Sequence, residues 1–279
     1  MNGPTQDSCF RATVAAVALA IAAFVAAVPS SAQADDSRMC AVPANLLRSP
    51  YALPHIATKL KRGEAIKIVA LGSSSTEGVG ASSAAATYPS QFQAELQRLW
   101  PKTRITVLNK GVSGEQAQQM IGRFERDVIA EKPDLLIWQT GTNSALAQGD
   151  VERFVADVDW GLDRAHELGI DVLLMTPQFS PRFEKVRNKL TYLHNLTTIG
   201  AVNGTPVLRR YEMMKHWLDS GQMTAQDMID PDGLHLTDRS YHCLGVVTAK
   251  MVAVLATMPA KPAPAPALTA SAGGSRPIR

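Results

Sequence analysis

Asp232 and His235 stand in the segment 230–238, which also contains the turn-forming residues Pro231 and Gly233. An aspartate three residues before a histidine in a tight loop can accept a hydrogen bond from Nδ1–H and leave Nε2 facing a nucleophile. The other five histidines lack this combination of a nearby aspartate and turn residues, and we interpret them as surface or packing groups. Asp232 and His235 therefore predict an orienting carboxylate and a general base.

Three other segments are small, polar and rich in glycine, and each follows an apolar run. They read GSSSTEG at 72–78, NKGVSGE at 109–115 and QTGTNS at 139–144. Their hydroxyls, side-chain amides and sterically open backbone N–H groups suit a site where negative charge develops during a reaction. Nucleotide phosphate binding is the alternative, but neither a P-loop motif nor GxGxxG is present, so it is not favoured.

The elements that must position these segments can be read from the hydrophobic pattern. Five short apolar runs are typical of strands buried on both faces; they are Ile66–Leu71, Ile105–Leu108, Leu135–Trp138, Val172–Met175 and Pro206–Leu208. Five longer amphipathic segments predict helices; they are Tyr88–Leu99, Gln116–Ile129, Val151–Leu168, Phe183–Val202 and Asp238–Ala256. This alternation predicts an α/β fold with a parallel sheet, whose ligands gather beyond the carboxyl ends of the strands.

Taken in order along the chain, the motifs resemble the four sequence blocks of the SGNH, or GDSL, hydrolase family. Residues 72–78 resemble the first block, G-D-S-x-T-x-G, and residues 109–114 resemble the second. Residues 141–143 resemble the third block, G-x-N, and Asp232 with His235 match the last, D-x-x-H. The resemblance implies a flavodoxin-like three-layer α/β/α sandwich with a mostly parallel, five-stranded sheet.

The resemblance also implies a role for each residue that matches a block. Ser74 is expected to be the nucleophile of a catalytic triad, with Asp232 as the orienting residue and His235 as the general base. The oxyanion hole is expected to consist of the backbone N–H groups of Ser74 and Gly114 together with the side-chain amide of Asn143.

Two positions depart from the family pattern. Ser73 stands where the family usually has aspartate, and Ser144 stands where aspartate often follows the asparagine of the third block. The acid of the first block helps to hold its loop by hydrogen bonds, a task that the single hydroxyl of Ser73 can share only in part. The departures favour a weaker or repurposed enzyme but do not indicate loss of the triad.

The resemblance implies an ester hydrolase that works through an acyl-enzyme on acetyl or short-chain acyl esters, including those of saccharides. An O-acyltransferase, a lysophospholipase or a thioesterase would use the same triad, so these alternatives stay open. A non-catalytic saccharide-binding domain is less favoured, because the four motifs would then have no reason to coincide. Tyr88, Phe179 and Tyr192 are aromatic candidates for substrate contacts, with ordinary packing as an equal alternative.

The first 34 residues have the features of an export signal. Arg11 precedes an apolar run over 14–28, and Ala32-Gln33-Ala34 resembles a cleavage site. A membrane anchor is the alternative, but the run falls short of the roughly 20 apolar residues that span a bilayer. We expect cleavage after Ala34 and a periplasmic or secreted protein without stable membrane insertion.

The remaining chain is expected to form one hydrolase domain over 35–258, followed by a disordered tail rich in Pro and Ala over 259–279. Of 28 basic and 25 acidic residues, one of each lies in the leader and three bases lie in the last 23 positions, which leaves 24 of each. A neutral body lacks the basic surface that nucleic acids require, so nucleic-acid binding is not predicted.

Cys40 and Cys243 remain after removal of the leader, which contains Cys9. An oxidising compartment would allow a disulfide between them, and two separate buried thiols are the alternative, since sequence gives no distance. No cluster of cysteine and histidine has zinc-ligand spacing, and no motif indicates a cofactor, so neither a metal nor a cofactor is predicted. The sequence does not indicate an oligomeric state.

Overall fold

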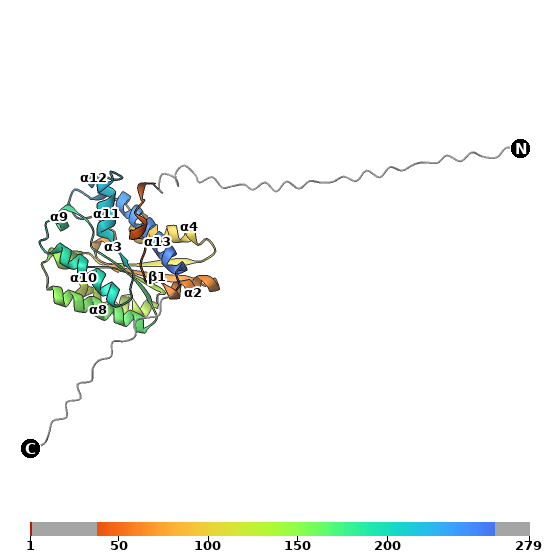
Figure 1. The fold of residues 1–279 in the computed structure, drawn as a ribbon, viewed down its shortest axis with the longest axis horizontal. Helices are drawn as coiled ribbons and strands as arrows, with labels where there is room; N and C mark the ends of the chain where they lie inside the picture. Colours follow the sequence, from red (N-terminus) through yellow and green to blue (C-terminus); the bar gives the residue numbers. More distant parts are fainter. Residues whose placement is uncertain (2–37, 260–279) are drawn as a thin grey trace, which may run out of the picture.

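The computed structural model, which describes Met1 and residues 38–259, contains a five-stranded parallel sheet with helices on both faces (Figure 1). The strands are β1 (Ile66–Gly72), β2 (Ile105–Gly111), β3 (Leu135–Gln139), β4 (Asp171–Met175) and β5 (Val207–Leu208). Their order across the sheet is β2-β1-β3-β4-β5, and every adjacent pair is parallel. This is the strand order of flavodoxin-like folds, so the predicted α/β architecture is confirmed.

The longer helices are α2 (Pro54–Arg62), α4 (Tyr88–Leu99), α8 (Val151–Glu167), α10 (Lys189–Val202), α11 (Arg210–Asp219) and α13 (Asp238–Thr257). The shorter helices are α3 (Ser74–Glu77), α5 (Ala117–Gly122), α6 (Phe124–Asp127), α7 (Thr142–Leu146), α9 (Pro181–Glu184) and α12 (Ala225–Met228), with 3-10 turns at η1 (Ala44–Leu46), η2 (Ala84–Ala86) and η3 (Ile129–Glu131). The predicted export signal (1–34) and the predicted tail (259–279) fall outside these elements and, except for Met1 and Pro259, outside the described residues.

Each strand sends alternate side chains into two hydrophobic cores. In β1, Ile68 and Ala70 join the core that also contains residues of α4, α11 and α13. Val69 and Leu71 join the other core, with residues of α8 and α10. Figure 1 shows α8 and α10 on one side of the sheet and α4, α11 and α13 on the other. Burial on both faces is the reason that the central strands β1, β3 and β4 read as continuous apolar runs, whereas the edge strands β2 and β5 are partly exposed.

Two of the five predicted helices are interrupted. The segment 116–129 divides into α5, α6 and the start of η3, and the break falls at Arg123, whose backbone leaves helical geometry (φ −117°, ψ 7°) while its guanidinium bonds to the end of β1. The segment 183–202 divides into α9, which begins two residues earlier with Ser180 as its N-cap, and α10, which begins at Lys189. Helices α2, α11 and α12 were not predicted, and neither were the short helices α3 and α7, whose residues were assigned to loops.

A disulfide joins Cys40 to Cys243, with 4.9 Å between the two Cα atoms. It ties the segment before η1 to the buried face of α13, across a sequence separation of 203 residues. The same segment is held by the indole of Trp217, which donates to the Ala41 carbonyl. Closing a loop of this length lowers the chain entropy of the unfolded state, a stabilisation of about 5 kcal/mol in the polymer model.

Within residues 38–259, one helix, α13, is long and apolar enough to cross a membrane by length and composition, and 72% of its most apolar window is buried in the fold. Its apolar side chains form much of the core on that side of the sheet. The burial identifies α13 as a core helix of the sandwich.

The N-terminus of α2 is capped by a side chain at the amino end of β4. The carboxylate of Asp171, the first residue of β4, accepts a hydrogen bond from the Ile56 N–H at 2.9 Å. Burial raises the pKa of Asp171 to about 6, and the neighbouring Asp134 adds to this rise, although the backbone N–H groups of Ile56 and His55 oppose it.

We expect Asp171→Asn to change the pH dependence of folding stability. Because the folded pKa lies above that of the unfolded chain, the carboxyl stabilises the fold below about pH 4, and this contribution is lost as pH rises through about 6. Asparagine does not titrate and keeps an oxygen that accepts from Ile56. Urea unfolding should show the wild-type stability falling relative to the variant by up to about 3 kcal/mol over that interval. This assignment would be contradicted if the free energy of unfolding of the wild type, minus that of the variant, stayed constant or increased with pH over that interval.

Candidate active site

Ser74 lies directly after β1, at the first position of α3, and 7% of it is exposed. The turn is closed by the N–H groups of Thr76 and Glu77, which both donate to the Ser73 carbonyl at 2.9 Å. As the first residue of a helix, Ser74 has a backbone N–H without an acceptor inside that helix. The hydroxyl and N–H of Ser74 are therefore placed together at the carboxyl end of β1.

Gln139, the last residue of β3, fixes this turn by hydrogen bonds from the neighbouring strand. Its Oε1 accepts from the N–H of Ser73 at 3.0 Å, from the Ser73 hydroxyl at 3.2 Å and from the Thr76 hydroxyl at 3.1 Å. The sequence placed Gln139 at the start of the third polar segment but gave it no role, because no family motif includes that position. The sequence predicted that Ser73 could only partly replace an aspartate in holding this loop. Both the N–H and the hydroxyl of Ser73 are nevertheless hydrogen-bonded, because Gln139 supplies the acceptor.

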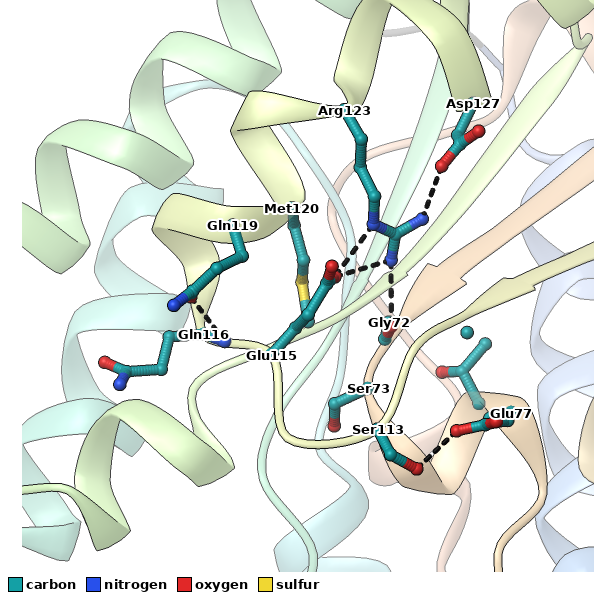
Figure 2. A network of polar contacts seen from close by, with 12 residues as sticks. Gly72, Ser73, Glu77, Ser113, Glu115, Gln116, Gln119, Met120, Arg123 and Asp127 are labelled. Atoms are coloured by element: carbon teal, nitrogen blue, oxygen red, sulfur yellow. Dashed lines mark hydrogen bonds and ion pairs between the residues drawn. The ribbon is translucent and has the colours of Figure 1, made fainter.

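Arg123 connects the first and second loops, as Figure 2 shows. Its buried guanidinium donates to the Gly72 carbonyl at 3.2 Å, to Glu115 at 2.8 Å and to Asp127 at 2.9 Å. Hydrogen bonds from Arg126 and Arg123 outweigh the effect of burial and hold the pKa of Asp127 well below its usual range. Arg123 therefore stays paired with an ionised Asp127 while its bonds to Gly72 and Glu115 fix the end of β1 to the loop after β2.

Gly114 lies on the second loop, and Asn143 lies in α7 within the third segment. A hydrogen bond from the Asn143 side chain to the backbone beside Gly114 joins the two. Gly114 is exposed, adopts φ +79°, and has no atom within 4 Å of the position that a Cβ would occupy. The side-chain amide of Asn143 donates to the Glu115 carbonyl at 2.9 Å, one residue beyond Gly114. This bond uses one of the two amide protons of Asn143 and leaves the other for a further acceptor.

The fourth loop is a closed turn between α12 and α13. Ile229 and Leu236 form an antiparallel bridge, and the Asp230 N–H donates to the His235 carbonyl at 2.9 Å. Asp232 Oδ1 accepts from the N–H groups of Leu234 at 2.8 Å and His235 at 3.0 Å. Asp232 Oδ2 contacts His235 Nδ1 directly. Both carboxylate oxygens are therefore engaged, and the imidazole is held by Nδ1.

The pKa of Asp232 reflects two opposing effects. Burial acts to raise it, but the backbone hydrogen bonds from His235 and Leu234, together with the imidazole, prevail and lower it. Asp230 differs, because burial and the charge of Asp232 both raise its pKa. The hydrogen bonds of Asp232 thus favour its ionised form, and Asp232 is the acid that holds the histidine.

The nucleophile loop and the histidine loop are packed against each other. The Tyr241 hydroxyl donates to the Val79 carbonyl at 2.7 Å, five residues after Ser74. At Gly80 (φ +90°) a Cβ would lie 2.3 Å from Asp230 Oδ2 and 2.6 Å from the Leu236 carbonyl, so only glycine fits. Among the described residues no hydrogen bond joins the Ser74 hydroxyl to His235, so contact between nucleophile and base stays a prediction.

The three aromatic residues considered as substrate contacts are buried instead. Tyr88 and Tyr192 are 0% exposed and Phe179 is 9% exposed. The Tyr88 hydroxyl lies 3.3 Å from the Thr76 hydroxyl, and the Tyr192 hydroxyl donates to the Gly149 carbonyl at 2.8 Å. These rings fill the interior and satisfy their polar atoms there, so the structure does not place them on an open binding surface.

Over residues 38–259, no group of three or more His, Cys, Asp or Glu side chains is arranged to hold a metal ion.

Solved structures with the same fold include several esterases. A two-domain esterase active on acetylated mannans is 20% identical, with a TM-score of 0.64 over 78% of this chain and 59% of that chain. A lipolytic protein assigned to the G-D-S-L family, from Desulfitobacterium hafniense DCB-2, is 21% identical, with a TM-score of 0.56 over 67% of this chain and 99% of that one. Identities this low show a shared fold alone.

One relative and one family model match this chain by sequence. An acetylxylan esterase from Geobacillus stearothermophilus is 35% identical over 100 residues, which are 33% of this chain and 46% of the relative, so the match spans less than half of that enzyme. A model of the Non-GDSL lipase-like family matches residues 39–258. That match includes all four loops and most of the chain, and the protein therefore belongs to the Non-GDSL lipase-like family.

Proposed function

We propose that this protein is an exported serine ester hydrolase that removes acetyl or other short acyl groups from saccharides. The observation that carries the proposal is the Asp232–His235 pair, held by Nδ1 on a loop that packs at Asp230 and Leu236 against Gly80 of the segment that follows Ser74. The similarity to an acetylxylan esterase, and the fold shared with an esterase active on acetylated mannans, support an acetylated saccharide as substrate.

In the proposed mechanism the Ser74 hydroxyl attacks the ester carbonyl and transfers its proton to His235 Nε2. Asp232 accepts the Nδ1–H bond and stabilises the imidazolium that forms. The tetrahedral intermediate then expels the sugar alcohol, which takes the proton from His235, and an acyl-enzyme remains. Water, deprotonated by the same imidazole, hydrolyses the acyl-enzyme and releases acetate.

The negative charge on the carbonyl oxygen is assigned to three donors. They are the backbone N–H groups of Ser74 and Gly114 and the second amide proton of Asn143. Gly114 suits this role because its surroundings are open, and Asn143 suits it because Glu115 already fixes its orientation. Preorganised donors of this kind contribute roughly 3 kcal/mol each to transition-state stabilisation in other hydrolases.

The first test concerns nucleophile and base. Ser74→Ala and His235→Ala should each lower kcat on acetylated xylo-oligosaccharides and on 4-nitrophenyl acetate by roughly 10⁴-fold or more, because the two groups act as a unit. Ser220→Ala and His194→Ala are matched controls, since both residues are exposed and lie outside the four loops. Released acetate, measured against acetyl transferred to added sugar, separates hydrolysis from acyl transfer.

Two outcomes would count against the proposal. Wild-type turnover by Ser74→Ala would show that the nucleophile is assigned wrongly, and the triad would go with it. A wild-type protein that is inert on all esters yet binds the saccharides would favour the non-catalytic binding domain.

Asn143→Ala tests the oxyanion assignment. It should reduce kcat by roughly 10² to 10³-fold and change KM little, because the amide binds charge that is present mainly in the transition state. Thermal unfolding of the same variant reports on the lost bond to the Glu115 carbonyl. A variant that loses stability but keeps its kcat would show that Asn143 only supports the loop.

Export is proposed from the first 34 residues and is supported by the Cys40–Cys243 disulfide, since such bonds persist in oxidising compartments. Protein recovered from the extracytoplasmic fraction should begin at Asp35 by N-terminal sequencing. Its intact mass should rise by two hydrogen atoms on reduction, and Cys40→Ser should abolish that rise. A chain that still begins at Met1 in the membrane fraction would contradict export.

A further inference from the structure

Arg210, the first residue of α11, is 0% exposed and forms no ion pair with any acid of the described chain. An unpaired buried cation carries a large desolvation cost, so its other contacts must compensate. Burial lowers the pKa of Arg210 to about 10, and the Tyr88 and Tyr241 hydroxyls oppose this effect. None of the steps assigned above uses this residue.

The three nitrogens of the guanidinium donate to three acceptors in two segments, the one that follows β4 and the one that follows β1. Nε donates to the Thr176 carbonyl at 3.0 Å, just beyond β4, and Nη1 donates to the Ser75 hydroxyl at 3.1 Å. Nη2 donates to Gln178 Oε1 at 2.7 Å. Ser75 follows Ser74 directly, so one arm of the fork reaches the residue beside the proposed nucleophile.

Gln178 extends the contacts of Arg210 to the other two loops. Its Oε1 also accepts from the Thr142 hydroxyl at 2.9 Å, and its Nε2 donates to the Leu234 carbonyl at 3.3 Å. A guanidinium has only donors, so the oxygen of Gln178 must face Arg210 and its amide group must face Leu234. Thr142 precedes Asn143 and Leu234 precedes His235, so both arms end one residue from a group of the proposed site.

We propose that Arg210 is a positioning residue that sets the nucleophile, oxyanion and histidine loops against one another. The inference rests on the proposed hydrolase function, because the loops it joins carry Ser74, Asn143 and His235. A planar fork with donors in fixed directions can bind three acceptors at once, whereas an ammonium group on a flexible chain cannot reproduce that geometry. Three loops from distant parts of the sequence thereby share one rigid centre.

Arg210→Lys separates geometry from charge, because lysine keeps the positive charge and loses the fork. The variant should lower kcat about 10²-fold with KM within about threefold of wild type, since displacements near 1 Å are sufficient for such losses. Ser75→Ala, which removes one arm, should lower kcat about fivefold, and in the Arg210→Lys background it should cost less than twofold because the shared contact is already lost.

Leu255→Ala is the matched control for general destabilisation. Leu255 is 0% exposed and lies near the far end of α13, where its carbonyl accepts from Leu53. It should lower the melting temperature without changing kcat at 25 °C. If Arg210→Lys does not fold, Ser75→Ala decides, and wild-type kcat in that variant would overturn the inference.

A fluorophosphonate probe gives a readout that does not depend on the ester substrate. Ser74 Oγ forms a bond to phosphorus, fluoride leaves, and His235 takes the proton, so the labelling rate reports the assembled nucleophile and base. We expect Arg210→Lys to slow labelling at least 10-fold. If the wild type is labelled but hydrolyses no acetyl ester, the proposed substrate is refuted. The role of Arg210 is then still tested by the labelling rates of wild type and Arg210→Lys. Equal rates for wild type and Arg210→Lys would overturn the role of Arg210 alone.

Discussion

The close approach of β1 to its own loop is the constraint on which the arrangement of this site depends. A Cβ at Gly72 would lie 2.1 Å from the Thr76 hydroxyl and 2.7 Å from Gln139 Oε1, so the strand can turn into α3 only through glycine. The Gly72 carbonyl then accepts from the Val112 N–H at 3.0 Å and from Arg123 at 3.2 Å. The end of one strand thereby fixes the first two loops, and the buried polar groups beneath them must satisfy one another.

The sequence predicted those features of the fold that leave a signal in consecutive residues, namely the strands and the motif-bearing loops. All five strands were found from their apolar runs, which in β1, β3 and β4 follow from burial on both faces. The four loops were found because each carries a short motif at a strand end or helix start. The break at Arg123 and the start of α9 at Pro181 were missed. The break at Arg123 depends on a bond to the distant Gly72 carbonyl, which leaves no periodic signal. The start of α9 is set by the Ser180 cap, and the Arg182 N–H also donates to the distant Gly233 carbonyl.

The groups that support the site were missed for a related reason. Ser75 and Arg210 are 135 residues apart, and Gln178 and Leu234 are 56 apart, so no local spacing connects them. The aromatic residues show the converse difficulty, because the same ring suits both a binding surface and a core. Only the structure separates the two uses, by placing the hydroxyls of Tyr88 and Tyr192 against internal partners.

The absence of the usual aspartate at position 73 follows from the orientation of Gln139. The backbone N–H of residue 73 can only donate, so Gln139 must turn its oxygen toward this loop, whatever side chain stands there. A hydroxyl at position 73 can donate to that oxygen, whereas an ionised carboxylate would face it with a second acceptor. Gln139 Nε2 is buried and has no hydrogen-bond partner among the described residues, so it donates nothing to the loop. Ser73 and Gln139 are therefore a matched pair, and the departure from the G-D-S pattern exchanges one way of supporting the nucleophile loop for another.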